Sequence, residues 1–134
     1  MKKKILLIDD HPDDYSDYIS VLKENYDVDV TAYISTARIK LQPNKYDLIV
    51  IDIMMPTLGE DFKENEEDGL KTGLAFYEAE LKGKSIPALF WCWNEDFKKD
   101  VKDKKWDKTD FLLKETDDEH LLKGVERFCD KFKI

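Results

Sequence analysis

The chain has 134 residues, of which 42% are hydrophobic and 39% charged, and its formal net charge is −8. Because one hydrophobic core usually holds about 100–200 residues, we expect residues 1–134 to form a single domain. The acidic excess argues against direct binding to nucleic acid or to anionic membranes, and two cysteines are too few for a disulfide framework, which favours the cytoplasm.

Three short apolar runs predict strands that are buried on both faces, because each run is continuous rather than alternating. They are residues 5–8, 48–51 and 88–93. The first run is too short for a signal peptide, which needs about 7–15 apolar residues, or for a membrane span of about 20. No membrane segment is therefore expected.

Two weaker patterns complete a set of five strands. Residues 28–32 alternate between apolar and polar, as in a half-exposed edge strand. The second pattern is the short apolar run of residues 111–113. Both are therefore expected to be strands.

Helical spacing of apolar residues separates the strands. A first stripe contains Tyr15, Tyr18, Ile19 and Leu22, and a second contains Leu70, Leu74, Tyr77 and Leu81. Gly83 is expected to end the second helix, and Thr116 and Glu119 are expected to form a capping box at the start of the last one. The highly charged residues 95–108 predict at most a marginal helix, anchored by Phe97 and Val101.

The order of elements predicts the fold class. Strands that alternate with helices through short loops form a parallel sheet covered by helices on both faces. In such doubly wound sheets, ligands bind beyond the carboxyl ends of the strands. An acidic stretch at about 57–69 interrupts the pattern and is expected to be an inserted, mobile loop.

Carboxylates gather where two of the buried strands end. Asp9 and Asp10 follow the first run, and Asp52 follows the second. Single aspartates after strands are often turn formers or helix caps, but three at one sheet edge would repel one another unless a cation neutralised them. Carboxylate oxygens are the ligands that Mg²⁺ prefers, so this edge is a candidate magnesium site.

Lys114 follows the last strand and is expected at the same edge. Its ammonium could bind a phosphoryl oxygen; alternatively, it is a surface lysine or a structural ion pair with Asp52. A carboxylate nucleophile, a metal ion and a cation together are suited to phosphoryl transfer onto aspartate.

These residues resemble the receiver domain of bacterial response regulators. The matching motifs are Ile8-Asp9-Asp10, Ile51-Asp52-Ile53-Met54-Met55-Pro56 and Leu112-Leu113-Lys114. The resemblance implies a flavodoxin-like fold with strand order 2-1-3-4-5. It implies Asp52 as phospho-acceptor, Mg²⁺ held by Asp9, Asp10, Asp52 and the backbone carbonyl of Met54, Lys114 as phosphoryl-binding residue, and Phe111 as the aromatic switch residue.

Three positions depart from the pattern that this resemblance implies. Cys92 stands where the family has a serine or threonine that switches on phosphorylation, and a thiol is a weak hydrogen-bond donor. Trp93 replaces the small residue that usually follows and could crowd the pocket mouth. Glu115 replaces a proline, which puts the family's cis peptide bond there in doubt.

The other notable side chains are given structural interpretations first. Cys92 and Cys129 are expected to be buried, and the pair Trp91 and Trp93 is expected to pack in the core. His120 is expected to be solvated near the start of the last helix. His11 is expected to be a loop residue.

The leading function is a stand-alone response regulator that receives a phosphoryl group on Asp52. Its partners would be a sensor histidine kinase or histidine phosphotransfer protein and an unidentified downstream protein. The alternative is a pseudo-receiver, an interaction module that signals without phosphorylation. An aspartate-nucleophile phosphatase is disfavoured, because neither Asp9 nor Asp52 begins the D-x-D motif of such enzymes, and no turnover enzyme is expected.

Overall fold

A computed structural model describes residues 2–42, 45–55 and 72–134 of the chain. Within these residues it contains one sheet of five parallel strands in the order β2-β1-β3-β4-β5. The strands are β1 (Lys4–Ile8), β2 (Asp27–Thr31), β3 (Leu48–Asp52), β4 (Ala88–Cys92) and β5 (Thr109–Leu113). The flavodoxin-like strand order expected from the resemblance is confirmed.

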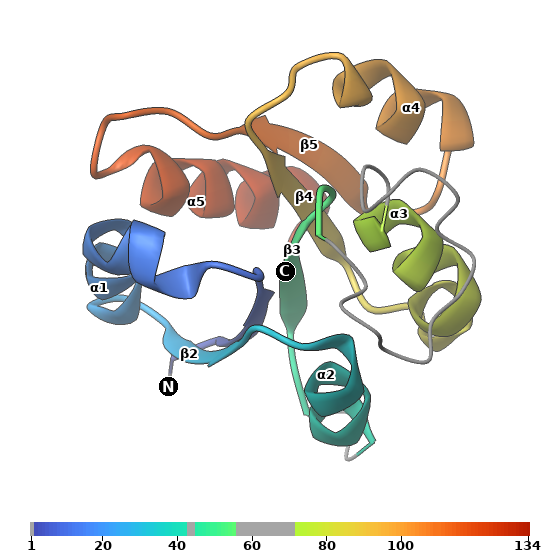
Figure 1. The fold of residues 1–134 in the computed structure, drawn as a ribbon, viewed down its shortest axis with the longest axis horizontal. Coiled ribbons are helices and arrows are strands. Elements are labelled where there is room, and N and C mark those ends of the chain that lie inside the picture. The colour runs from blue at the N-terminus through green and yellow to red at the C-terminus, as the bar shows by residue number, and fades with distance from the viewer. Residues whose placement is uncertain (1, 43–44, 56–71) are drawn as a thin grey trace.

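Helices cover both faces of this sheet. The helical segments are η1 (Pro12–Tyr15), α1 (Ser16–Lys23), α2 (Ile34–Leu41), α3 (Thr72–Phe76) with its continuations η2 (Tyr77–Leu81) and η3 (Lys82–Lys84), α4 (Phe97–Lys104) and α5 (His120–Phe132). α1 and α5 lie on one face, while α2, α3 and α4 lie on the other (Figure 1). The doubly wound architecture predicted from the alternating pattern is therefore present. None of the described helices is long and apolar enough to cross a lipid bilayer.

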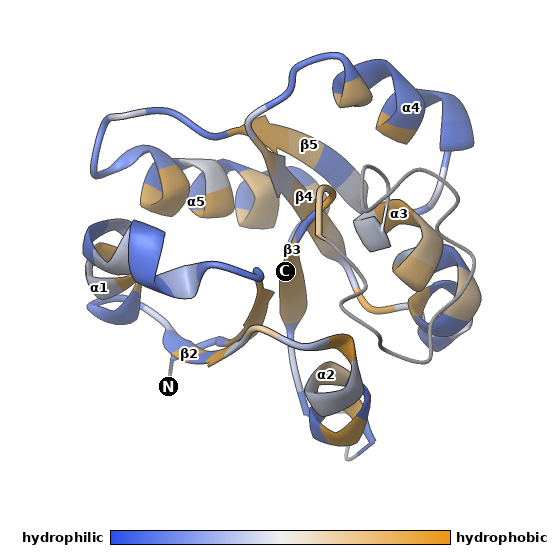
Figure 2. Ribbon diagram, viewed as in Figure 1, coloured by the Kyte–Doolittle hydropathy of each residue, from blue (hydrophilic) through white to orange (hydrophobic). Residues whose placement is uncertain are grey.

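The continuous apolar runs form the centre of the core because their side chains alternate between two helical layers. In β1, Leu6 and Ile8 belong to the cluster under α2, α3 and α4, whereas Ile5 and Leu7 belong to the cluster under α1 and α5. Figure 2 shows the hydrophobic strands between the helices. Burying one such side chain contributes about 1.5–3 kcal/mol to the free energy of unfolding. The apolar side chains on both faces of the sheet therefore stabilise the packing of the helices against it.

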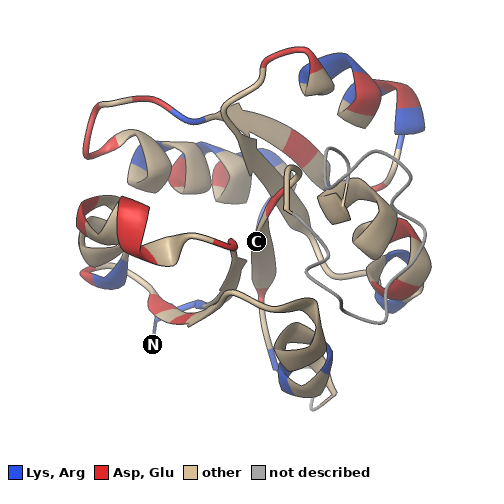
Figure 3. Ribbon diagram, in the orientation of Figure 1, with Lys and Arg blue, Asp and Glu red and all other residues tan. Residues whose placement is uncertain are grey.

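The charged helix matches its sequence pattern, whereas the edge strand matches in part, because Thr31, a polar member of the alternation, is buried. β2 lies at one edge of the sheet, where Asp27 is exposed and Val28 is buried. In α4, Phe97 and Val101 are buried and anchor a helix whose other face carries charges of both signs (Figure 3). The marginal helix predicted for this segment therefore forms.

Two predicted helix ends are wrong. α5 begins at His120 and Thr116 does not cap it; instead, the side chain and the carbonyl of Asp117 accept hydrogen bonds from the amides of Glu119 and His120, each at 3.1 Å. The second helix does not end at Gly83, because a π turn and a 3-10 turn carry it further. The left-handed residue that ends it is Ser85, with φ of 58°.

Part of the predicted organisation falls outside the described residues. This applies to the acidic insertion at about 57–69, to Pro56 of the motif after β3, and to Leu70 of the second helical stripe. The remaining members of that stripe, Leu74, Tyr77 and Leu81, are buried as predicted.

Candidate functional site

The three aspartates meet at the carboxyl edge of the sheet because β1 and β3 are neighbours in register. Ile8 pairs with Ile51, so the residues that follow them, Asp9 and Asp52, lie side by side. One carboxylate oxygen from each of Asp9, Asp10 and Asp52 lies within 4.8 Å of the others. Asp9 is 0% exposed and Asp52 is 6% exposed, so this is an enclosed cluster rather than a solvated acidic surface.

Backbone amides hold one oxygen of each buried carboxylate. His11 N donates to Asp9 Oδ1 at 2.8 Å, and Met54 N donates to Asp52 Oδ1 at 3.0 Å. Asp9 is fixed further because its own amide donates to the Thr31 carbonyl of β2 at 3.1 Å. Each carboxylate therefore keeps a set orientation, with its second oxygen turned toward a shared cation.

The cation shared by Asp9 and Asp52 is the Lys114 ammonium, and Lys114 is 2% exposed. Its Nζ donates to Asp9 Oδ2 at 2.8 Å and to Asp52 Oδ2 at 3.0 Å. Burial opposes its positive charge, but Asp52 and Asp9 outweigh burial and raise the pKa of Lys114 above its usual value. The Lys114 amide donates to the Cys92 carbonyl at 2.8 Å, which fixes this lysine to the end of β4.

The cluster carries more negative than positive charge. Burial, together with repulsion from Asp9, raises the pKa of Asp52 to about 7, although Lys114 opposes the shift. Burial is also the main reason why the pKa of Asp10 is raised. Three carboxylates against one ammonium leave room for a second cation, and an all-oxygen donor set fits Mg²⁺. The residues present therefore suit a hard divalent ion.

Three other predicted site residues, Cys92, Phe111 and Met54, are buried or half-buried. Cys92 is fully buried, its Sγ accepts a hydrogen bond from Asn94 N at 3.5 Å, and burial raises the pKa of the thiol. Phe111 is half-buried against the α4 side of the core, three residues before Lys114. Met54 contributes its amide to Asp52, as described above.

The expectation that both neighbouring tryptophans pack in the core is half wrong. Trp91 is 0% exposed, whereas Trp93 is 49% exposed, and its Nε1 donates to the hydroxyl of Tyr15 at 2.7 Å. Trp93 is the first residue after β4, and its side chain lies outside the core. The peptide bonds of the described residues, including the one before Glu115, are trans.

Sequence reasoning missed aromatic side chains beside Lys114. The Lys114 Nζ lies 4.0 Å from the centroid of the Tyr15 ring and 4.6 Å from that of Trp91. His120, expected to be solvated, is 5% exposed and accepts a hydrogen bond from Trp91. The spacing of His120, Gly124 and Phe128, four residues apart on one helical face, is a signal that could have placed His120 inside.

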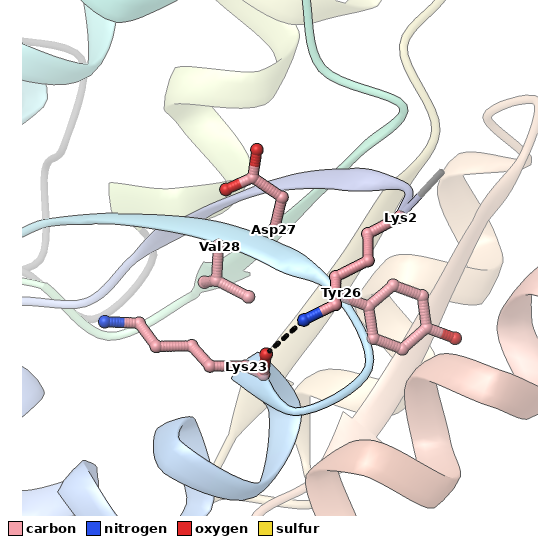
Figure 4. Close-up of a pocket in the computed structure, with 5 residues that line it drawn as sticks. All are labelled: Lys2, Lys23, Tyr26, Asp27 and Val28. Atoms are coloured by element: carbon pink, nitrogen blue, oxygen red, sulfur yellow. Dashed lines mark hydrogen bonds between the residues drawn. The ribbon is translucent and has the colours of Figure 1, made fainter.

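A hollow lies at the opposite, amino end of the sheet. It has a volume of about 520 Å³ and is lined by Lys2, Lys23, Tyr26, Asp27 and Val28 (Figure 4). Inside it, Lys2 Nζ donates to the Lys23 carbonyl at 3.3 Å. The hollow contains neither the three clustered aspartates nor Lys114, so the candidate site remains the carboxyl edge.

Several solved structures with the same fold are response regulators or receiver domains. The chemotaxis response regulator CheY4 of Vibrio cholerae is 24% identical, with a TM-score of 0.72 over 96% of this chain and 99% of that one. The response regulator TrrA of Thermotoga maritima, solved in complex with Mg²⁺ and BeF, is 22% identical, with a TM-score of 0.67 over 94% and 98%. The non-phosphorylated HemR receiver domain of Leptospira biflexa is 23% identical, with a TM-score of 0.71 over 95% and 94%.

Sequence comparison gives the family. No curated protein matches the chain. The family model described as "Response regulator receiver domain" matches residues 5–126, which include the three strand-end aspartates and Lys114. The chain therefore belongs to the response regulator receiver domain family.

Proposed function

We propose that this receiver domain accepts a phosphoryl group on Asp52 in cytoplasmic two-component signalling. The donor is a sensor histidine kinase or a histidine phosphotransfer protein, and the phosphorylated domain signals through a downstream protein. The observation that carries the proposal is the contact of the Asp52 carboxylate with the buried Lys114 ammonium at 3.0 Å, inside a cluster of three aspartates. Membership of the receiver family supports the same interpretation.

The chain's own residues prepare Asp52 for attack on phosphorus. The Met54 amide holds Oδ1 and Lys114 contacts Oδ2, so the carboxylate is oriented before the donor arrives. An Asp52 oxygen forms a bond to phosphorus while the bond from phosphorus to the donor's leaving atom breaks. Lys114 remains within reach of Asp52 Oδ2 and can neutralise charge on the transferred group. Attack by water on the acyl phosphate later releases inorganic phosphate and restores the free carboxylate.

Mg²⁺ completes the proposed site. Asp9, Asp10, Asp52 and the Met54 backbone carbonyl would hold it, and it would supply positive charge to the phosphoryl oxygens. Support comes from the all-oxygen donor set and from the raised pKa of Asp52, which a further cation would lower. The solved complex of TrrA with Mg²⁺ and BeF is consistent with this choice of metal.

The domain is proposed to be a switch rather than a turnover enzyme. Lys114 and the three aspartates provide for one phosphoryl transfer onto the chain and for its later hydrolysis. Release of many equivalents of product per chain within the lifetime of the Asp52 phosphoryl adduct, from a small phosphate ester such as p-nitrophenyl phosphate, would contradict this part of the proposal.

Intact-mass measurement tests the proposal. The protein is incubated with acetyl phosphate and Mg²⁺, with acetyl phosphate and EDTA, and as the Asp52→Asn variant with Mg²⁺. We expect a single phosphoryl adduct in the first sample and none in the other two. An adduct of equal yield in Asp52→Asn would contradict Asp52 as the acceptor.

Cys92 favours one second candidate, a receiver that signals without phosphorylation. The Cys92 thiol is buried, is a weak hydrogen-bond donor and accepts a hydrogen bond from the Asn94 amide. The family has a switching hydroxyl at this position. For such a pseudo-receiver, binding of the downstream partner would be the same for the wild type and Asp52→Asn. Partner binding that depends on phosphorylation of Asp52 would support the first proposal.

A further inference from the structure

Lys114 is held by aromatic rings as well as by carboxylates. Two of its three N–H groups are accounted for by Asp9 and Asp52. The ring centroids of Tyr15 and Trp91 lie 4.0 Å and 4.6 Å from the same nitrogen, close enough for cation–π attraction. Because Lys114 is almost fully buried, water screens neither attraction, and the aromatic faces help to set where the ammonium lies.

The orientation of the Trp91 ring depends in turn on His120. Trp91 Nε1 donates to His120 Nε2 at 3.0 Å, and both side chains are buried. A buried indole N–H requires an acceptor, and His120 supplies it from the first residue of α5. The hydrogen bond therefore ties β4 to α5 directly beside the site.

His120 is itself fixed on its other side. Its Nδ1 lies 2.7 Å from the carbonyl oxygen of Asp117. Since Nε2 accepts from Trp91, this network assigns the ring proton to Nδ1, which then donates to Asp117. The Tyr18 ring packs edge-on against the imidazole, with centroids 4.9 Å apart. Neutral His120 thus presents a rigid acceptor to Trp91.

We propose that His120 is a positioning residue for phosphoryl transfer, which acts through Trp91 on Lys114. It orients the indole whose ring helps to hold the Lys114 ammonium against Asp52. Its connection to the reaction rests on the proposed function of Asp52, but the placement of Lys114 can be measured without that reaction. A purely structural His120 would stabilise the start of α5 without influencing Lys114.

Two substitutions separate these roles. His120→Asn keeps a donor at the position of Nδ1 for Asp117 but is too short to reach Trp91 Nε1. His120→Gln places an amide oxygen near the position of Nε2 and so keeps the acceptor. Trp106→Phe is a matched control, because Trp106 packs against Tyr77 and Phe90 on the opposite face of the sheet.

The first readout is the NMR signal of the Lys114 ε-methylene protons in metal-free protein. Protons that lie over an aromatic face are shifted upfield by its ring current. We expect the upfield shift to shrink in His120→Asn and to be retained in His120→Gln and Trp106→Phe. An unchanged Lys114 signal in a folded His120→Asn variant overturns the proposal, whether or not Asp52 accepts a phosphoryl group.

The second readout is the rate of Asp52 phosphorylation by acetyl phosphate with saturating Mg²⁺. The cation–π contribution predicts a rate about three- to tenfold lower in His120→Asn and close to wild type in His120→Gln. Combining His120→Asn with Trp91→Phe should add no further loss, because Trp91→Phe already lacks the shared N–H. If the two substitutions lower the phosphorylation rate additively, His120 does not act through Trp91 and the proposal is overturned. If the wild type forms no adduct, the proposed function fails and the NMR readout alone decides the placement.

Discussion

At the scale of single residues, Asp52 combines two opposed requirements. A nucleophile must be an ionised carboxylate, yet burial and the adjacent Asp9 raise its pKa to about 7. Lys114 counters this shift but is shared with Asp9. The side chain that performs the proposed reaction therefore carries a cost in folding stability, as is common at sites whose residues are arranged for function rather than for packing.

This cost predicts how Asp52→Asn changes the pH dependence of stability. Asp52 has its pKa raised on folding from 3.8, so between about pH 4 and pH 7 the folded state binds more protons than the unfolded state. Wild-type stability therefore falls as pH rises through this window, and the asparagine variant lacks that loss. We expect metal-free Asp52→Asn to be more stable by about 1–3 kcal/mol at pH 8 and by little at pH 4.

Urea unfolding in EDTA at several pH values measures this difference. Asp103→Asn serves as the control, because Asp103 is exposed on α4 and its substitution should leave the pH dependence nearly unchanged. A gap between wild type and Asp52→Asn that stays constant or narrows as pH rises would show that Asp52 is not the source of the cost.

At the scale of elements, α3 is docked unusually close to the end of β3. Gly73 N donates to the Ile53 carbonyl at 2.9 Å. A Cβ added at Gly73 would overlap the Asp52 carbonyl oxygen and would lie 2.8 Å from Ile53 Cα. Both are backbone atoms that cannot rotate aside, so glycine allows this helix to approach the site.

Gly73→Ala should therefore destabilise the protein strongly. We expect a loss of about 2–4 kcal/mol in the free energy of unfolding, because α3 must move away from β3 to relieve the overlap. Gly83→Ala is the matched control: a Cβ there meets nothing within 4 Å, so it should be neutral or stabilising by up to about 1 kcal/mol. Equal effects of the two substitutions on the urea midpoint would contradict the close approach at Gly73.

The strands were predictable because their signal is physical and local. A continuous apolar run such as residues 48–51 can bury all its side chains only in a sheet that helices cover on both faces. Helix ends were less predictable because more than one nearby side chain can bind the free amides at the start of a helix, and the local backbone decides which one does. Thr116 could cap a helix, but Asp117 binds the amides instead, and a π turn moves the left-handed position from Gly83 to Ser85.

At the scale of the whole molecule, the topology assembles the site from distant parts of the chain. Lys114 and Asp9 are 105 residues apart in sequence but are joined by a hydrogen bond of 2.8 Å. The parallel sheet brings the ends of β1, β3 and β5 to one edge, so a few strand-end residues can form a dense charged cluster.

For the same reason, the charged centre of the site could be predicted and its aromatic surroundings could not. Asp9, Asp52 and Lys114 each follow a recognisable strand, so topology alone brings them together. Trp91 and His120 meet through side-chain packing between β4 and α5; helical spacing can place His120 inside the protein, but it does not specify Trp91 as its partner. Trp93 shows the same limit, because Cys92 is fully buried and the next residue, Trp93, is half exposed.

The most direct test maps the phosphorylated residue. Protein treated with acetyl phosphate and Mg²⁺ is reduced with borohydride, which converts an aspartyl phosphate to homoserine, and is then digested and sequenced by mass spectrometry. We predict homoserine at position 52, absent when EDTA replaces Mg²⁺. Homoserine at Asp9, Asp10, Asp61 or Asp68 instead of Asp52 would contradict the proposed phospho-acceptor.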